Sequence, residues 1–339
     1  MIEEILMALV CILVSFLVSF FLVKMWIKLT KNHPSMLVPD VNKYGNPMVP
    51  KTGGIVILIS TAFSIFLYIF CKTFLLNSLA HVTEILSLLL VMLFAGFIGF
   101  IDDIFGWKKS SITGYKKILM TIPIAVPLMV INAGHSAMSL PFLGSVNLGL
   151  LYPLVIIPLA IVGTTNGFNL LGGFNGLEAS LGVIIFSALG LICFFTGQVW
   201  LALISAVIVA SLIAFLIFNK NPAKILPGNA FTYILGSLIG CFAILGNMEK
   251  AALILFIPFI IEGFLKLRSK FKAHCMGVPN RDNSLELRHK NTYSWTHIAM
   301  KTIKKIKGKV FETEVVLFVL IIELIFALFA LLNVLFGII

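Results

Sequence analysis

Charged residues are scarce in this chain of 339 residues, and acidic ones are the scarcest. Only 12% of the residues are charged, and the 14 Asp and Glu are outnumbered by 25 Lys and Arg. Soluble domains carry about 25% charged residues, so this shortage, with a mean hydropathy of +1.08, excludes an ordinary soluble protein. Cysteine is also rare. The five cysteines show no CxxC or metal-type spacing, which argues against a disulfide framework or a cysteine metal site.

Long apolar stretches fill the sequence instead. Runs of roughly 17–25 apolar residues can cross a hydrocarbon core ~30 Å thick, and they predict an all-α, polytopic integral membrane protein. We expect a single transmembrane domain over residues 1–339, a bundle of about ten helices, with a basic cytosolic loop at 267–313. The expected spans are 5–27, 52–71, 83–101, 117–133, 150–165, 177–195, 199–218, 229–247, 250–266 and 314–337.

The first of these stretches is interpreted as a retained helix. It has no basic residues before it and no small-residue cleavage site, and it continues into Lys24, Trp26 and Lys28, which is unlike a signal peptide.

The distribution of Lys and Arg predicts how the chain is oriented. All of the 25 Lys and Arg except Lys72 and Lys250 fall on one side of the expected arrangement. The positive-inside rule makes that side cytosolic and places both termini outside. The net charge of +11 is therefore mostly a signal of topology, and no nucleic-acid partner is needed to explain it. Part of the charge can also serve anionic lipid head groups or an anionic substrate.

Five polar patches at the ends of the expected spans fall on that same side, which predicts one polar site there. They are Asn42-Lys43 with Lys51, Asp102-Asp103 through Lys117, Asn166 to Glu178, Asn219 to Asn229, and the basic loop from Lys266 to Lys309.

Asp102 and Asp103 form the acidic part of this predicted site. They end a span that runs from outside to inside, so the helix dipole disfavours each of them by a few tenths to ~1 kcal/mol. Their mutual repulsion would also raise one pKa. A pair placed against two local penalties suggests a counter-ion, either Mg²⁺ or a lysine, and Lys117 is a candidate. The alternative is a solvated pair that anchors a helix end at the interface.

The segment from Asn166 to Glu178 has three asparagines and four glycines between two spans. Glycines let backbone approach a ligand closely, and amides donate and accept hydrogen bonds without the desolvation cost of a charge. An ordinary Asn/Gly turn is the alternative. The interleaved Phe168, Leu170, Leu171 and Phe174 predict that the loop is packed.

Asn229 stands at the expected start of a helix. There it would act as an N-cap, and the same helix end would direct free N–H groups at a phosphate.

In the basic loop, Arg and Lys could bind phosphates, although such a charge run is most often a solvated face. The stretch 301–307 is more typical of an interfacial basic anchor. Its irregularly spaced histidines are weak evidence for a metal, and His33, His81 and His135 are interpreted as structural.

Taken together, the order of these patches resembles the polyprenyl-phosphate N-acetylhexosamine-1-phosphate transferases. The resemblance covers nearly the whole chain. Its most specific parts are Ile101-Asp102-Asp103, Asn166-Gly-Phe-Asn169, Gly173-Phe-Asn175-Gly176-Leu-Glu178, and the run from Phe218 to Gly228. Gly172, Asn175 and the segment Pro39 to Lys43 are similar to the UDP-GlcNAc:dolichyl-phosphate branch of this family.

Site residues follow from this resemblance, position by position. It implies catalytic roles for Asp102, Asp103 and Lys117, and a Mg²⁺ ion, with Mn²⁺ as the alternative, held by Asn169, Asn229 and Asp103. The implied substrate-binding residues are Asn42, Lys43, Asn166, Asn169, Asn175, Glu178, Arg288, His289 and His297. The register of the last loop, which contains the final three, stays open.

The sequence departs from the family pattern at two positions. Asn229 stands where the family usually has an Asp that binds Mg²⁺; an amide oxygen can still coordinate a hard cation, but a full negative charge is lost. Lys51 stands where the dolichol branch tends to have Glu near the uracil.

The resemblance implies transfer of GlcNAc-1-phosphate from UDP-GlcNAc to a polyprenyl or dolichyl phosphate at a cytosolic active-site cleft, with release of UMP. Asp102 or Asp103 would be a base for the lipid phosphate, if that phosphate is protonated. Two alternatives stay open: a bacterial-type enzyme that uses undecaprenyl phosphate, and a membrane transporter. The short last loop favours an archaeal cell membrane over the endoplasmic reticulum. Many family members are dimers, so a homodimer is expected from the resemblance alone.

Overall fold

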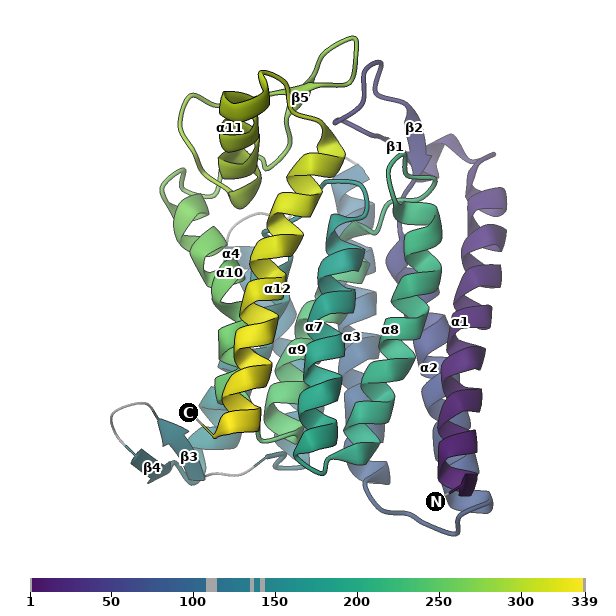
Figure 1. Cartoon of the computed structure of the whole chain (residues 1–339). Helices are drawn as coiled ribbons and strands as arrows, with labels where there is room; N and C mark the ends of the chain where they lie inside the picture. The colour runs from purple at the N-terminus through teal and green to yellow at the C-terminus, as the bar shows by residue number, and fades with distance from the viewer. Residues whose placement is uncertain (1, 108–114, 135–136, 141–143, 338–339) are drawn as a thin grey trace.

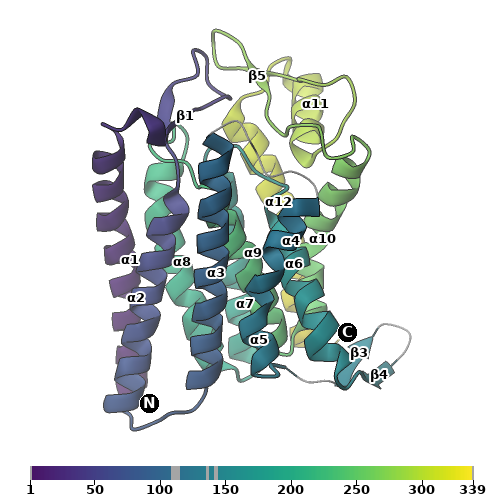
Figure 2. The same ribbon diagram turned by 180° about the vertical axis from the view of Figure 1, so that it is seen from behind.

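A computed structural model describes residues 2–107, 115–134, 137–140 and 144–337. Most of it is a bundle of helices that run side by side, as Figures 1 and 2 show. The long helices are α1 (Ile2–Thr30), α2 (Gly53–Phe74), α3 (Val82–Trp107), α7 (Leu177–Phe195), α8 (Val199–Asn219), α9 (Gly228–Leu245), α10 (Glu249–Leu267) and α12 (Glu312–Phe336). The shorter helical pieces are η1 (Pro34–Met36), α4 (Tyr115–Thr121), η2 (Ile122–Ala125), α5 (Val126–Val130), η3 (Tyr152–Ile156), α6 (Ile157–Phe168) and α11 (Trp295–Lys307).

Strands are confined to three two-stranded antiparallel ribbons in the described residues. They pair β1 (Leu37–Pro39) with β2 (Met48–Pro50), β3 (Ala137–Leu140) with β4 (Gly144–Asn147), and β5 (Val278–Pro279) with β6 (Leu285–Glu286). The prediction of an all-α polytopic membrane protein is confirmed.

Seven helices in the described residues are long and apolar enough to cross a membrane, and they coincide with seven of the ten expected spans. The fourth expected span is broken into α4, η2 and α5, where Pro123 and Pro127 each remove a backbone donor. The fifth is a shorter apolar stretch, Tyr152–Phe168. The ninth is helix α10, 19 residues long, which carries Glu249, Lys250, Glu262 and Lys266.

The start of α1 and the end of α12 lie at one end of the bundle, at the bottom of Figure 1. The ribbons β1–β2 and β5–β6 and helix α11 lie at the opposite end, together with the last turn of α3 and the first turns of α7 and α12. All five polar patches contribute to one cavity there, as the sequence predicted.

Helix α9 is the central element, and its side chains are buried from Ala230 to Ile244. Two glycines allow α2 and α3 to reach its first turn. A Cβ at Gly54 would lie 2.2 Å from the Phe231 nitrogen, and one at Gly99 would lie 2.5 Å from the Ala230 Cα. Because real Cβ atoms do not come so close, only glycine permits this approach, and it brings Asp102 and Asp103 against the start of α9.

Candidate active site

A cavity of about 670 Å³ opens at the polar end of the bundle. Its volume lies in the range usual for small-molecule sites. Four cations contribute to its wall, together with three amides and two carboxylates. The polar and charged residues that line it are Asp40, Lys51, Lys117, Asn169, Asn175, Glu178, Asn229, Thr232, Lys266, His274, Cys275 and Arg288.

Asp102 is nearly fully buried beside this cavity and holds a lysine at the wall. The Nζ atom of Lys117 lies 2.7 Å from Asp102 Oδ2, so the predicted ion pair is present. The same oxygen accepts hydrogen bonds from Asn229 Nδ2 at 3.0 Å and from the Tyr233 hydroxyl at 3.0 Å. Three donors on one oxygen fix the carboxylate firmly, and among the described residues its other oxygen, Oδ1, receives no hydrogen bond.

Asp103 is fully buried and caps helix α9 from outside that helix. Its Oδ1 accepts the Asn229 backbone N–H at 2.9 Å, and its Oδ2 accepts the Ala230 N–H at 3.3 Å. Lys51 adds an ion pair, with its Nζ 2.8 Å from Oδ1. A carboxylate at a helix N-terminus is favoured by the dipole and by the N–H groups that lack partners within the helix. The favourable interaction of Asp103 with the N-terminus of α9 offsets its unfavourable interaction with the dipole at the C-terminal end of α3.

The prediction that Asn229 caps its own helix is therefore wrong. Helix α9 begins at Gly228, its N-cap is Pro227, and the Asn229 side chain reaches to Asp102 instead. Its first backbone N–H groups bind Asp103, so they are not free for a phosphate. Gly228 allows this contact, since it has φ +78° and a Cβ there would lie 2.6 Å from Asp103 Oδ2.

The oxygen atoms beside the cavity are of the kind that bind a hard divalent cation, but they carry little negative charge to balance it. Asp102 Oδ1, Asn229 Oδ1 and Asn169 Oδ1 are oxygen donors of the kind that Mg²⁺ and Ca²⁺ accept. Thr232 Oγ1 donates to Asn169 Oδ1 at 2.7 Å and so orients that amide. Both Asp103 oxygens are already occupied. In the described part of the chain, no three His, Cys, Asp or Glu side chains group as metal ligands.

The Asn/Gly loop is packed, as its sequence predicted. Phe168, Leu171 and Phe174 are buried. Asn175 donates from Nδ2 to Asp40 Oδ2 at 2.8 Å, and its backbone N–H donates to Glu312 at 2.7 Å. The loop is thus held between the β1–β2 segment and the start of α12.

Glu178 contributes a buried carboxylate to the same part of the cavity. Its Oε1 accepts the Gly173 N–H at 2.7 Å. Its Oε2 is buried with no hydrogen-bond partner in the described residues. A buried polar atom without a partner is costly, so a donor from a ligand would stabilise this group.

Three predicted substrate-binding residues hold the walls together and do not line the cavity. Asn42 donates to Gly173 O at 2.6 Å and accepts from Gly277 N at 3.2 Å, which joins three loops. Lys43 forms an ion pair with Glu312 at 2.6 Å. Asn166 donates to Thr121 at 2.8 Å, between α6 and α4.

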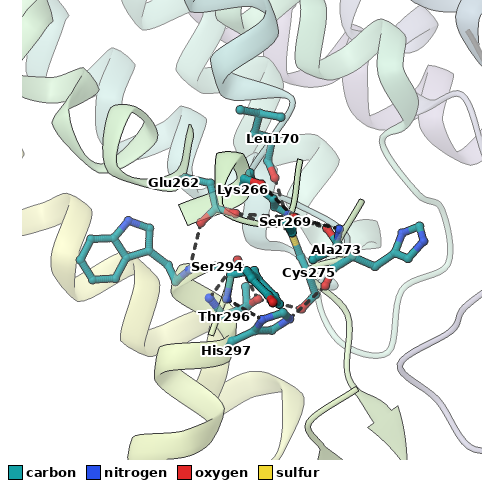
Figure 3. Close-up of polar contacts among 12 residues, drawn as sticks. Leu170, Glu262, Lys266, Ser269, Ala273, Cys275, Ser294, Thr296 and His297 are labelled. Carbon is teal, nitrogen blue, oxygen red and sulfur yellow. Dashed lines mark hydrogen bonds and ion pairs between the residues drawn. The ribbon is translucent and has the colours of Figure 1, made fainter. Parts of the chain in front are cut away.

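A polar network fixes the segment 271–276, which forms one side of the cavity (Figure 3). From α10, Lys266 Nζ donates to Ala273 O at 2.8 Å, and Glu262 accepts the Trp295 N–H at 2.9 Å. From α11, Thr296 donates to Cys275 O at 2.7 Å. The Cys275 thiol in turn contacts Leu170 O at 3.3 Å, so the network connects the Asn/Gly loop to the basic loop.

His297 belongs to this network and lies outside the cavity lining. It is fully buried, its Nε2 donates to His274 O at 2.9 Å, and its Nδ1 accepts the Tyr293 N–H at 3.2 Å. Both ring nitrogens are used in the neutral form. Burial above all, with the nearby charges of Lys266 and His289, lowers its pKa to about 4, although the bond to His274 acts in the opposite direction.

The other predicted residues of the basic loop divide between the cavity and its surroundings. Arg288 lines the cavity, and so does His274, a histidine of this loop for which no role was predicted. Burial and the charge of Arg288 lower the pKa of His274. His289 packs against Tyr293 and His297, and its Nε2 is buried without a partner in the described residues.

Sequence reasoning missed several residues that build the site. Tyr233, Thr232 and Glu312 carry no motif of their own, and Asp40 lies in the segment Pro39 to Lys43 but no role was predicted for it. Tyr233 lies four residues after Asn229, which places both on one face of a helix, and that spacing is the one signal that could have found it.

Fold and cavity together define a polytopic membrane protein with a charged, water-facing pocket at one end of its helix bundle. The sequence model of glycosyl transferase family 4 matches residues 85–247. A protein of Saccharolobus solfataricus, named as a candidate UDP-N-acetylglucosamine–dolichyl-phosphate N-acetylglucosaminephosphotransferase, is 39% identical over 96% of this chain and 97% of its own length. A Sulfolobus acidocaldarius protein of the same name is 34% identical over 97% of each chain.

Matches to a second group of proteins are shorter. The phospho-N-acetylmuramoyl-pentapeptide-transferase of Listeria monocytogenes is 31% identical over 63% of this chain and 66% of its own length. Given the two matches over nearly the full length, the chain belongs to glycosyl transferase family 4.

Proposed function

We propose that this protein transfers GlcNAc-1-phosphate from UDP-GlcNAc to a dolichyl or other polyprenyl phosphate, and releases UMP. The observation that carries the proposal is the pairing of Asp102 with Lys117 at the wall of a cationic cavity. Two relatives that match this chain over nearly their full length bear that activity in their names. The product, a polyprenyl-diphosphate GlcNAc, would be the first lipid-linked sugar for protein N-glycosylation.

The reaction makes and breaks one phosphorus–oxygen bond. An oxygen of the lipid phosphate attacks the β-phosphorus of UDP-GlcNAc, and the bond from that phosphorus to the bridging oxygen breaks, so both electrons leave with UMP. Such a transfer depends mainly on alignment and on neutralising negative charge. Lys117, held on Asp102, supplies fixed positive charge, and Arg288 and Lys266 extend it along the cavity.

A divalent cation, Mg²⁺ or alternatively Mn²⁺, is part of this proposal. When bound, it would neutralise phosphate oxygens. Asp102, Asn169 and Asn229 would hold it. Asp102 is tied by three donors on one oxygen, and the lipid phosphate, with a second pKa of about 6, needs little help to lose a proton. A base role for Asp102 or Asp103 would be excluded if the Asn variants turned over at the wild-type rate.

The cavity end is proposed to be cytosolic, and the two chain termini to lie outside. The positive-inside rule supports this orientation, because all Lys and Arg except Lys72 and Lys250 fall on the cavity side of the predicted arrangement. The matches to a Saccharolobus and a Sulfolobus protein favour an archaeal cell membrane. A homodimer is proposed from the family resemblance alone.

The test is UMP release by purified protein in detergent, with UDP-GlcNAc, dolichyl phosphate and Mg²⁺, beside an Asn229→Asp version. We expect release by both, with the Asp version needing less Mg²⁺ because it restores a carboxylate. If neither version releases UMP although both bind UDP-GlcNAc, the transferase proposal is contradicted. Activity with UDP-MurNAc-pentapeptide in place of UDP-GlcNAc would instead favour the bacterial-type reaction.

A further inference from the structure

Lys51 is a cation of the cavity wall, and it stands where the dolichol branch of the family tends to have a Glu near the uracil. Its Nζ lies 2.8 Å from Asp103 Oδ1, and its side chain is 22% exposed whereas Asp103 is fully buried. Since Lys51 lines the cavity, that exposed part of the side chain faces the space where a ligand would lie.

The backbone around Lys51 is fixed to the segment that leads to Asn229. The Lys51 N–H donates to Met36 O at 3.2 Å, and the next two glycines donate to Leu226 O and Pro227 O at 3.1 and 3.0 Å. Thr52 between them has φ +70°, a left-handed conformation that a threonine adopts only when its surroundings impose it. Lys51 is therefore held in place on both sides of its own peptide.

Asp103 does not need Lys51 to be satisfied. It already accepts two backbone N–H groups from the positive end of α9, which stabilise a buried carboxylate. An ammonium group has three N–H donors. Lys51 Nζ forms its ion pair with Asp103, and among the described residues it donates no hydrogen bond to another protein acceptor.

We propose that Lys51 binds a phosphate oxygen of the nucleotide donor, beside Lys117. The proposal rests on the proposed function and deepens it, because it names a residue that recognises the diphosphate. In this chain the two lysines flank Asn229, the position where the family usually has a carboxylate. A divalent cation bound here would have one carboxylate ligand fewer than is usual in the family. Lys51 would then provide additional fixed positive charge for the phosphates at this site.

The structure offers a variant set that separates this role from two simpler ones. Lys51→Met removes the ammonium, Lys51→Arg keeps a cation, and the double variant Lys51→Met/Asp103→Asn removes both members of the ion pair. Lys250→Met, in the first turn of α10 at the opposite end, is the control. Melting temperatures identify any variant that fails to fold.

The measurement is the dissociation constant of UDP-GlcNAc by calorimetry, together with the ratio of the UMP and CMP dissociation constants. Loss of a hydrogen bond between charged groups should weaken UDP-GlcNAc binding about 10- to 100-fold in Lys51→Met. The double variant should stay equally weak, Lys51→Arg should retain most of the affinity, and the UMP/CMP ratio should not change.

Three results would overturn the inference. Wild-type affinity in Lys51→Met would mean no ligand contact, and recovery in the double variant would mean that Lys51 serves only to neutralise Asp103. A changed UMP/CMP ratio would place Lys51 at the base and not at the phosphates. If wild-type protein binds no uridine nucleotide at all, the proposed function fails; if it binds and turns over while Lys51→Met is unaffected, only the inference fails.

Discussion

Asp102 and Asp103 are neighbours in sequence but serve different partners. On one oxygen, Asp102 pairs with Lys117 and accepts hydrogen bonds from Asn229 and Tyr233, and in the described residues its other oxygen receives none. Asp103 faces α9 and binds its first backbone N–H groups. Adjacent residues on a helix point about 100° apart, so one acidic pair can be divided between a structural task and a chemical one.

Replacing Lys117 by Met should lower UMP release by about 100-fold or more, since removal of one charged group that stabilises a developing anion typically has an effect of this size. It would also leave the buried Asp102 without its cation. The matched control is Lys116→Met, because Lys116 is exposed and forms no ion pair in the described residues. Equal rates for the two variants would refute the role of Lys117.

Replacing Tyr233 by Phe removes one of the three donors on Asp102 Oδ2. A hydrogen bond to a charged group contributes about 1.5–3 kcal/mol, so we expect a lower melting temperature in detergent and an activity loss smaller than that of Lys117→Met. Tyr44→Phe, at an exposed tyrosine, should leave the melting temperature unchanged. A fully stable Tyr233→Phe variant would show that the other two donors suffice.

At the scale of elements, helix α11 positions the segment 271–276, which forms one wall of the cavity. Ser294 caps its N-terminus, and the first-turn residues Thr296 and His297 bind the backbone of the cavity-lining segment. Glu262, fully buried in α10, accepts the Trp295 N–H at the same helix end. The polar contacts of α11 with the cavity-lining segment therefore run through its first turn, while Lys304 and Lys307 of its last turn pair with Glu286 and Glu314.

His297 predicts how stability depends on pH. Its pKa is about 4 in the folded protein against 6.5 unfolded, so below pH 6.5 the unfolded chain binds more protons and folding is disfavoured. The melting temperature should fall as pH decreases from about 6.5 towards 4, and the contribution is fully present above pH 6.5. His297→Gln should flatten this dependence, whereas His33→Gln, at an exposed histidine, should not. An unchanged slope in His297→Gln would exclude His297 as its source.

For the whole molecule, the separation of lysines between two ends predicts sidedness that can be measured. All five cysteines are free and buried, so the wild type should react little with a membrane-impermeant thiol reagent. Ala80→Cys, at the end away from the cavity, should be labelled in intact cells, and Lys290→Cys should be labelled only after the membrane is opened. The reverse pattern would place the cavity outside.

The sequence predicted features that depend on residues close together in the chain, on the length of apolar runs or on the number of Lys and Arg in each connection. The spans follow from the length of the apolar runs, and the common location of the five patches follows from the Lys and Arg distribution. Lys117 was a candidate counter-ion, beside Mg²⁺, for an acidic pair that had none nearby in the sequence. The cap that Asp103 provides to α9 joins residues 126 positions apart, and it depends on glycines that let α2 and α3 reach α9. No local pattern encodes that contact. The sequence also did not show which residues of the basic loop line the cavity. Only the packing of the folded protein buries His297 and leaves Arg288 at the cavity wall.

The start of α1 and the end of α12 share the face opposite the cavity (Figure 1). An affinity tag or a biotinylated peptide appended at either terminus would therefore attach the protein to a sensor chip with the opening of its cavity facing the solution. Nucleotide affinities of the variants described above could be compared on a single oriented surface, in nanodiscs, without the tether blocking entry.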